Sequence, residues 1–376
     1  MDGKGHRISF AAAALLAALV VFCRFDSQAA DFYSLRIYPA VSAALSWVSS
    51  VVPFSLNDLA IAGLVIAALA ILASAIFRKK RWTRCLAREL ELGLWVFVWF
   101  YAGWCTNYYR SDIFTRLRTQ RSAYDEQVFS HFLDEYTAML NESFDEASEG
   151  GALSPVEVEQ EVKYLYSHVP AKFGLAAPRK WQHPKPMLIR RVQSAVGVTG
   201  YMGPLAGEFH INSDVLPEDY PFTFAHEYSH LLGVSSEAEA NWWAYRVCCS
   251  SDDPRMRYSG CYSILSHVWN NARRLLDEDS FREWRSSITP EIISALIAEG
   301  EYWDSKRIPA LDKAQTFIYD LFLKANHVSS GIRNYSEVVQ MIISLDEKNL
   351  NCVNCPPLVT SEKNFQKEVQ TRTPTA

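Results

Sequence analysis

The chain has 376 residues and a net charge of −5, which allows one large domain with membrane elements or two modest domains. Its basic residues form no stripe beyond one short cluster, so we expect no nucleic-acid partner. Apolar residues crowd into about the first hundred positions, whereas the remainder has the composition of a water-soluble domain. The sequence therefore predicts a membrane domain over residues 1–110 and a second domain after it.

Three apolar runs in the first region approach the ~20 residues that a membrane-spanning helix needs. Ile8–Cys23 follows a short basic head, Ala60–Phe77 carries no charge, and Leu90–Trp104 is rich in Trp and Tyr. The aromatic residues at the end of the third run suit a membrane-interface belt, so we expect the lipid bilayer to be a partner. With their flanks, the runs predict about three transmembrane helices, over residues 8–23, 57–77 and 90–106.

A fourth uncharged stretch, Ile37–Phe54, differs from these runs in composition. It contains Pro39, Pro53 and several serines. Irregular backbone is tolerated at membrane depth only where protein or a water-filled cavity surrounds it. This composition therefore favours an interfacial or re-entrant segment over a true span.

Six basic residues between Arg78 and Arg88 predict the orientation of the chain. Such a cluster stays cytoplasmic, so the third run crosses outward and everything after Tyr108 lies outside the cytoplasm. We expect a multi-pass protein of the inner membrane with its second domain facing the periplasm or the exterior. Two alternatives stay open: residues 1–29 also resemble a signal peptide, and the apolar runs could be buried helices of a soluble protein.

The second domain, residues 111–348, is predicted to be mostly helical with a small β-sheet, and a polar tail follows over residues 349–376. The expected helices are Asp112–Glu149, Pro155–His168, Pro221–Leu232, Glu237–Cys249, Ser263–Leu276, Pro290–Ile297 and Ala310–Lys324. Met187–Val192 and Glu208–Asn212 are expected to be strands, joined by a glycine-rich connection. The predicted fold class is therefore α+β.

One motif in this domain has the spacing of a catalytic metal site. On a helix, His226 and His230 lie one turn apart on the same face, so both imidazoles can reach one ion. Glu227 is placed to take a proton from a water on that ion, which completes the H-E-x-x-H pattern of zinc peptidases. The alternative is a solvated helix with incidental histidines. The metal site is favoured because Pro221 begins the predicted helix and Gly233 ends it.

A catalytic zinc site needs a third protein ligand and one open position. The next predicted helix opens with two candidates, Glu237 and Glu239. Ser236 and Glu239 fit a capping box, which gives Glu239 a structural role. Glu237 is therefore favoured as the third ligand, with Glu239 as the alternative. His210 and Asp214 are weaker candidates.

With these residues, the chain resembles a bacterial, Bacteroidetes-type family of unknown function. Its members carry several N-terminal spans followed by an extracytoplasmic HExxH domain, which is grouped with the gluzincin-type zinc peptidases. The resemblance runs from about Tyr33 to about Asn271. Its most specific segments are Trp104–Arg110, Gly207–Asn212, Pro221–Asn241 and Arg257–Gly260.

The resemblance implies a zincin-like fold and a zinc site, and no known substrate. In the gluzincin pattern, a glutamate one turn before Asp or Asn is the third ligand, which corresponds here to Glu237 with Asn241. Only six residues separate His230 from Glu237, which departs from most gluzincins. The resemblance also implies that Glu208–Asn212 is the edge strand above the metal and that Tyr258 donates to the oxyanion of the reaction. The alternative for Tyr258 is a buried tyrosine with a satisfied hydroxyl.

Five cysteines, Cys248, Cys249, Cys261, Cys352 and Cys355, belong to the second domain. An oxidising compartment permits disulfides, and an odd count leaves at least one cysteine unpaired. Because the chain has no second C-x-x-C motif, we expect Cys352 and Cys355 to form a local disulfide or a link to the other three. His267 is expected to be a core or interface histidine rather than a ligand.

The sequence thus predicts a membrane-anchored zinc metallopeptidase that hydrolyses extracytoplasmic peptides or proteins. Zn²⁺ is held by His226, His230 and Glu237, and Glu227 is the general base. One alternative is a zinc-stabilised, non-catalytic protein of envelope binding or assembly, which would need no base. Another is a zinc hydrolase of non-peptide envelope material, which only substrate screening separates from a peptidase.

Overall fold

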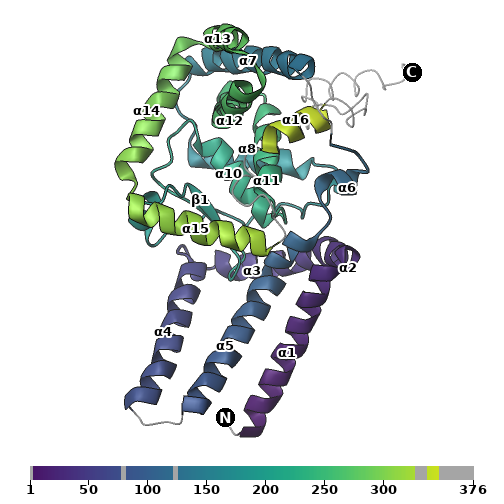
Figure 1. The fold of residues 1–376 in the computed structure, drawn as a ribbon, viewed down its shortest axis with the longest axis vertical. Coiled ribbons are helices and arrows are strands. Elements are labelled where there is room, and N and C mark those ends of the chain that lie inside the picture. The colour runs from purple at the N-terminus through teal and green to yellow at the C-terminus, as the bar shows by residue number, and fades with distance from the viewer. Residues whose placement is uncertain (1–2, 78–81, 122–125, 327–336, 347–376) are drawn as a thin grey trace, which may run out of the picture.

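The computed structural model describes residues 3–77, 82–121, 126–326 and 337–346. It has two parts (Figure 1): a group of long N-terminal helices, here called the arm, and a larger domain at one end of it, here called the outer domain. Residues 78–81 of the basic cluster, Cys352, Cys355 and the predicted tail lie outside the described residues.

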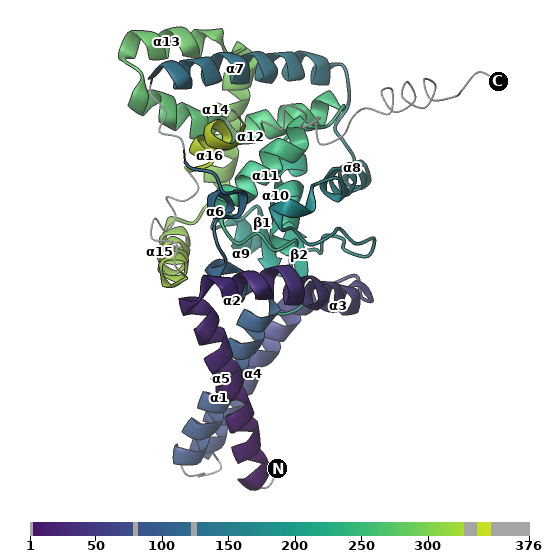
Figure 2. The same cartoon turned by 90° about the vertical axis from the view of Figure 1, so that its right-hand side faces the viewer.

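Three helices form the arm: α1 (Gly3–Phe25), α4 (Leu56–Phe77) and α5 (Trp82–Gly103). α1 and α4 are long and apolar enough to cross a membrane, with mean hydropathies of 2.3 and 2.7. Their apolar side chains face outward, and Leu15 and Ile66 are each 66% exposed. α5 runs beside them (Figure 2), but two arginines and two glutamates in its first half make it too polar to meet the same criterion. Two of the three predicted spans therefore have the required length and composition.

The segment predicted to be interfacial, Ile37–Phe54, lies across the ends of the arm helices (Figures 1 and 2). It contains α3 (Tyr38–Ser50), which follows α2 (Ser27–Phe32) and a π-helical turn (Tyr33–Ile37). Three serines of α3 are buried, and the hydroxyl of Tyr38 donates to the carbonyl of Leu231 at 2.8 Å. The segment is thus a helix packed under the outer domain.

The outer domain is mostly helical, as the sequence predicts. Its helices are α6 (Ile113–Leu117), α7 (Glu126–Ser148), α8 (Pro155–Ser167), α9 (Arg190–Ser194), α10 (Tyr220–Leu231), α11 (Glu237–Cys249), α12 (Pro254–Leu275), α13 (Glu278–Ser287), α14 (Pro290–Lys306), α15 (Pro309–Ala325) and α16 (Val338–Asp346), with 3₁₀ turns at Cys105–Tyr109 and Ala171–Phe173. The expected helix Asp112–Glu149 is interrupted at Arg118, which has a left-handed φ of 53°. α12 begins at Pro254 rather than Ser263 because Asp253 caps it, accepting from the N–H of Arg255.

The β-sheet has two antiparallel strands, β1 (Gly200–Gly203) and β2 (Glu208–Ile211). Two predictions fail here. Met187–Val192, expected to be a strand, forms a turn and the start of α9, and the glycine-rich connection contains β1. The bridge from Lys185 pairs with β2 on the side away from β1, so β1 and not Glu208–Asn212 is the outer strand. Strands this short depend on pairing with distant residues more than on local preference.

Helices α10 and α11 lie at the centre of the outer domain and pack against α8 and α12, while α7 packs on α12 (Figure 2). Almost every side chain of α10 and α11 is buried, including the indoles of Trp242 and Trp243. The H-E-x-x-H motif is therefore inside the hydrophobic core. Since buried polar groups need partners, its histidines and glutamate must be satisfied by each other or by a ligand.

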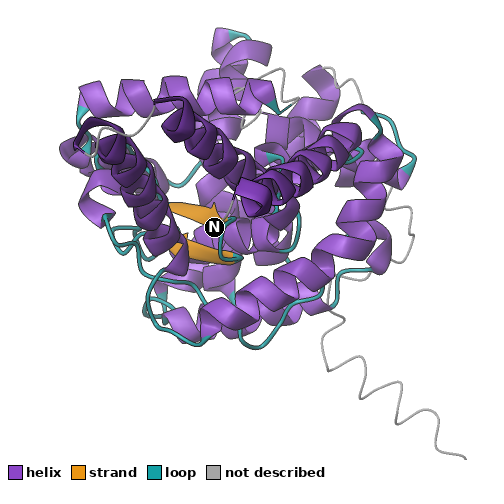
Figure 3. Cartoon of the chain, turned by 90° about the horizontal axis from the view of Figure 1, so that it is seen from below, coloured by secondary structure: helices purple, strands orange, loops and turns teal. Residues whose placement is uncertain are grey.

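The sheet rests on the N-terminal end of α4. The carboxylate of Glu208 accepts from the hydroxyl of Ser55 at 3.0 Å and from the backbone N–H of Asn57 at 2.7 Å. The side chain of Asn57 in turn accepts from the N–H of Leu205 at 3.2 Å. Seen from below, the two strands lie among the helices (Figure 3). These buried hydrogen bonds set the position of the sheet relative to the arm.

The approach of the sheet to α4 predicts a steric effect at Gly203. A Cβ atom there would lie 2.8 Å from Cγ of Asn57 and 3.0 Å from Cε1 of His210. We expect Gly203→Ala to destabilise the protein by about 1–3 kcal/mol and to lower its melting temperature. Gly151→Ala, where a Cβ would meet nothing within 4 Å, is the control. Equal melting temperatures of the two full-length variants in the same detergent would contradict the proposed contact.

Candidate metal centre

Helix α10 presents the two motif histidines on one face inside the core. Pro221 lies in its first turn, where the backbone N–H that proline lacks would have no partner within the helix. Gly233 follows the end of the helix and has a φ of 105°, which glycine adopts readily. The rings of His226 and His230 are 4.8 Å apart between centroids, and their Nε2 atoms are 3.1 Å apart. The two nitrogen atoms therefore converge on one point beside the helix.

Glu237, in the first turn of α11, reaches the same point. Its Oε2 lies 3.2 Å from Nε2 of His226 and 3.5 Å from Nε2 of His230. The short turn between the helices ends at Ser236, whose hydroxyl accepts from the N–H of Glu239 at 3.3 Å. Within the described residues no fourth His, Cys, Asp or Glu belongs to this group.

The separations in this cluster match the size of a zinc ion. Zinc binds His and Glu at about 2.0–2.2 Å in tetrahedral sites, which puts ligand atoms about 3.3–3.6 Å from one another. The three measured separations run from 3.1 to 3.5 Å. Two histidines and one glutamate form a donor set of catalytic zinc sites, in which the fourth position is left to water or substrate.

The neighbours of His230 select the tautomer that a metal needs. Its Nδ1 lies 2.7 Å from the carbonyl of Val234, so in the neutral ring Nδ1 carries the proton and Nε2 has the lone pair that a metal needs. Trp104 fixes the backbone at the same residue, since its indole N–H donates to the carbonyl of His230 at 2.7 Å. The Nδ1 atom of His226 is buried and has no hydrogen-bond partner in the described part of the chain.

The electrostatics of the cluster also favour a cation. Burial opposes a charged imidazolium, but the carboxylates of Glu237 and Glu227 and the carbonyl of Val234 together outweigh it and raise the pKa of His230 to about 9. Burial disfavours an ionised carboxylate, yet the charges of His230 and His226 hold the pKa of Glu237 well below its usual range. Without a metal, His230 and Glu237 therefore form an ion pair at neutral pH. The extra proton on His230 supplies positive charge at a place where a divalent cation could supply it instead.

Glu227 lies beside the three ligands and outside their group. Its side chain is packed against β1, where a Cβ on Gly200 would lie only 2.5 Å from Cγ of Glu227. Its Oε2 is buried and has no hydrogen-bond partner among the described residues. Burial raises the pKa of Glu227, although the charges of His226 and His230 oppose this. A carboxylate with a raised pKa and an open lone pair suits a proton acceptor.

Glu239, the alternative ligand, has another partner. Its Oε1 accepts from Nη2 of Arg116 at 2.5 Å, and both side chains are more than nine-tenths buried. The indole N–H of Trp243 donates to the same oxygen at 3.4 Å. The structure thus brings Glu237, and not Glu239, to the histidines.

The weaker candidates lie elsewhere. The ring of His210 stacks on that of Tyr201, with centroids 4.2 Å apart. Asp214 pairs with Arg190 at 2.6 Å. Burial, together with the charge of His226, lowers the pKa of His267 to about 4, so this histidine is neutral at pH 7.

The structure does not bring Tyr258 to the cluster, so its predicted catalytic role stays a prediction. The ring packs against those of Phe144 and Tyr262, with centroids 5.4 and 5.3 Å apart. Another tyrosine is present at the site: the hydroxyl of Tyr319, on α15, donates to Oε1 of Glu237 at 2.6 Å. Sequence reasoning missed Tyr319 because a single tyrosine on a helix 82 residues away carries no recognisable signal.

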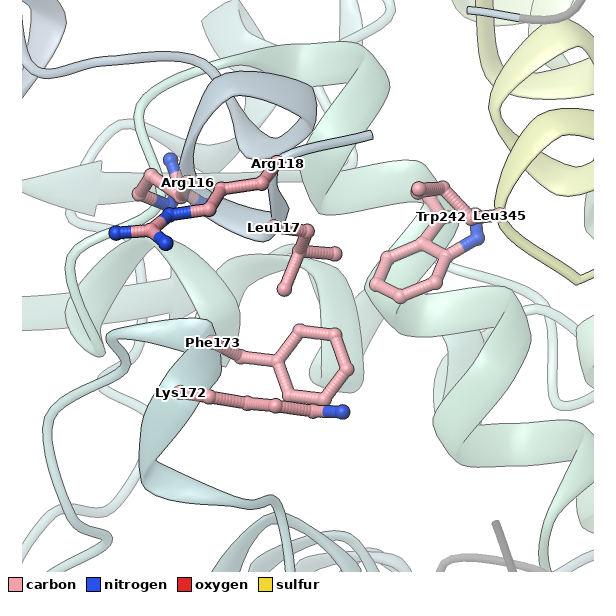
Figure 4. Close-up of a pocket in the computed structure, with 7 residues that line it drawn as sticks. All are labelled: Arg116, Leu117, Arg118, Lys172, Phe173, Trp242 and Leu345. Atoms are coloured by element: carbon pink, nitrogen blue, oxygen red, sulfur yellow. The ribbon is translucent and has the colours of Figure 1, made fainter. Parts of the chain in front are cut away.

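A cavity of about 150 Å³ is lined by none of the three cluster residues (Figure 4). Its walls include Phe173, Trp242 and Arg116, the arginine that pairs with Glu239. Its lining contains neither histidine nor carboxylate. This cavity therefore lacks the groups that metal binding or proton transfer would need.

The fold and the centre define a mostly helical protein that combines an apolar N-terminal arm with a buried cluster of two histidines and one glutamate. Residues 33–343 match the family described as "Protein of unknown function (DUF3810)", and the chain belongs to this family. No curated protein and no solved structure matches the chain. Membership of a family of unknown function agrees with the resemblance found in the sequence, whereas the relation to gluzincin peptidases stays a prediction.

The zinc content of two variants tests whether Glu237 or Glu239 is the third ligand. We expect about one zinc per chain in the full-length protein, measured by mass spectrometry of the metal. Glu237→Ala should lose the zinc because it removes one of three ligands. Glu239→Ala should keep it and melt at a lower temperature, since Arg116 is left buried without its carboxylate. Zinc lost with Glu239→Ala and retained by Glu237→Ala would reverse the assignment.

Zinc binding should release a proton. The pKa of His230 in the metal-free protein, about 9, is above its ordinary 6.5. The pair of His230 and Glu237 therefore contributes stability that is complete below pH 6.5 and is lost as the pH rises through 9. Because zinc needs the neutral imidazole, the apparent affinity should rise about tenfold per pH unit up to pH 9. Calorimetry in two buffers of different ionisation enthalpy measures the released protons, and no release at pH 7.5 would contradict this charge state.

Proposed function

We propose that this protein is a membrane-anchored zinc peptidase whose catalytic centre is the cluster of His226, His230 and Glu237. One observation carries the proposal: three buried ligand atoms lie at separations of 3.1–3.5 Å, and the described residues supply no fourth ligand. A structural zinc site is closed by four protein ligands, whereas a catalytic site keeps one position open. The motif and the glutamate on the following helix are also what the resemblance to gluzincin peptidases implies.

The residues of this chain have separate roles in the proposed hydrolysis. When bound, a zinc ion would polarise the scissile carbonyl and lower the pKa of water to about 7. His226 and His230 would hold the ion through their Nε2 atoms and Glu237 through its carboxylate, and the carbonyl of Val234 keeps the ring of His230 in the required orientation. Glu227 takes the proton of the attacking water and passes it to the leaving amine. Its buried position and raised pKa suit both transfers.

An extended polypeptide is the substrate class that strand β1 fits. β1 pairs with β2 along one edge, and no strand in the described part of the chain pairs with its other edge. Gly200 on this strand contacts Glu227. A peptide that adds to this edge through backbone hydrogen bonds would run past the general base. The proposed substrate edge is therefore Gly200–Gly203 instead of Glu208–Asn212.

We further propose that the outer domain lies outside the cytoplasm, at the periplasmic or exterior face of the inner membrane. α1 and α4 supply two apolar helices of sufficient length. α5 begins at the end of the arm that is remote from the outer domain (Figure 1), and its first turns carry Arg84 and Arg88. Arginines flanking a span remain on the cytoplasmic side, which supports this orientation.

One observation favours a second candidate function, a zinc-stabilised protein of envelope binding or assembly. The candidate ligands are nearly closed off from solvent: His226 is 9% exposed, Glu237 5% and His230 4%. Both candidate functions predict bound zinc. Only a measurement of peptide hydrolysis distinguishes the peptidase from the binding protein.

Glu227→Gln tests the peptidase. The variant should keep its zinc because Glu227 is not a ligand, and it should hydrolyse peptides about 10²–10⁴ times more slowly because the proton acceptor is gone. The measurement is cleavage of a peptide library by the full-length protein, followed by mass spectrometry. As a control, removal of zinc from the wild-type protein by a chelator should also abolish cleavage. Undiminished cleavage by zinc-loaded Glu227→Gln would refute the mechanism, and zinc-loaded wild type without any cleavage would favour the binding protein.

A further inference from the structure

Helix α15 (Pro309–Ala325) has two unlike faces. Tyr319 and Phe322 point into the protein, toward Glu237 and Tyr108. An adjoining side, centred away from Tyr319, carries four large apolar side chains that are 44–70% exposed, namely Leu311, Phe317, Ile318 and Leu321. At about 100° per residue, these four form a single stripe along the helix. A helix in the wall of a water-soluble domain normally buries such a stripe, so the exposed one needs a partner.

The position of α15 narrows the choice of partner. The ring of Phe322 packs edge-on against those of Phe100 on α5 and Tyr108, with centroids 6.1 and 5.6 Å apart. Asn326, next after the helix, accepts from the hydroxyl of Tyr101 at 2.8 Å. Both views show α15 across the base of the outer domain, close to the domain-side ends of the arm helices (Figures 1 and 2). α15 therefore lies where the apolar surface of the arm ends.

The surroundings of the stripe have the character of a membrane boundary. Trp99 near the end of α5 is 52% exposed, and Trp47 on α3, which lies across the ends of the arm, is 60% exposed. Exposed tryptophans gather at the membrane–water interface. Lys313 and Lys324 are exposed on α15, and Lys324 pairs with Asp320 at 2.6 Å. Long basic side chains such as that of Lys313 can reach lipid phosphates while the stripe is buried. A lipid surface explains why the apolar stripe, the exposed tryptophans and the domain-side ends of the arm helices lie close together.

We propose that α15 is a membrane-surface helix whose stripe of Leu311, Phe317, Ile318 and Leu321 is inserted at the headgroup–acyl boundary of a phospholipid bilayer. This is the bilayer that α1 and α4 cross. The inference goes beyond peptide hydrolysis, and it rests only on the membrane part of the proposed function.

Membrane contact by α15 places the candidate metal centre next to the bilayer. Phe317 is on the exposed stripe, and Tyr319, two residues later, donates to Oε1 of Glu237 at 2.6 Å from the inward face. One helix, about 10–12 Å across, thus separates the lipid from a metal ligand.

Photo-crosslinking of the full-length protein in proteoliposomes tests this placement. p-Benzoylphenylalanine replaces one residue at a time in vesicles of phosphatidylcholine and phosphatidylglycerol with radiolabelled acyl chains. The test positions are Phe317 and Leu321. Val156 on α8, 63% exposed and part of the outer domain away from the arm (Figure 2), is the matched control for Phe317 at 70%. Ile66 on α4, 66% exposed, reports on membrane insertion of the arm.

We expect lipid adducts at Phe317, Leu321 and Ile66, and at least about tenfold fewer at Val156. Adducts at Phe317 and Leu321 that are no more abundant than at Val156 would overturn the proposal. Crosslinks from these positions to a second copy of the chain in place of lipid would overturn it too. Lipid adducts at Ile66 without adducts at Phe317 would reject the membrane-surface helix while leaving a membrane-anchored peptidase intact.

Discussion

A carboxylate and two imidazoles meet in the middle of a helical core, where each would be costly to bury alone. Glu237 compensates the charge that His230 carries in the metal-free protein, and a divalent cation would compensate the carboxylate when bound. The contact requires the first turn of α11 to lie against the last turns of α10. Helices α8, α12 and α16 and the two-stranded sheet pack directly against this pair. The chemistry of the centre and the architecture of the domain therefore depend on the same contact.

The end of α10 links this contact to the arm. The last carbonyl groups of a helix have no partner within it. Here the carbonyl of His230 accepts from Trp104, that of Leu231 from Tyr38, and that of Gly233 from Arg110. All three donors belong to segments at the domain-side end of the arm. They fix the end of the motif helix against the arm, and the family match, residues 33–343, covers both parts of this contact.

The sheet shows where local reasoning from the sequence stops. Met187–Val192 has a strand-like composition but forms a turn and the start of α9, whereas the glycine-rich Gly200–Gly203 is a strand. β1 exists because β2 pairs with it, and Gly200 suits the position because Glu227 leaves no room for a Cβ atom. Neither reason is visible in a window of a few residues. The helices, in contrast, were mostly predictable from periodicity and caps, which are local.

By itself the sequence determined the features that arise within one or two turns of helix. The spacing of His226 and His230 puts them on one face, and the cap formed by Ser236 begins α11 at Glu237. The apolar runs of α1 and α4 are long enough to span a bilayer regardless of their neighbours. Only the tertiary structure decided that Gly200, Trp104 and Tyr319 surround the cluster, and that Tyr258 packs apart from it. Contacts between residues far apart in the chain depend on how all the helices pack together, and no local pattern specifies that packing.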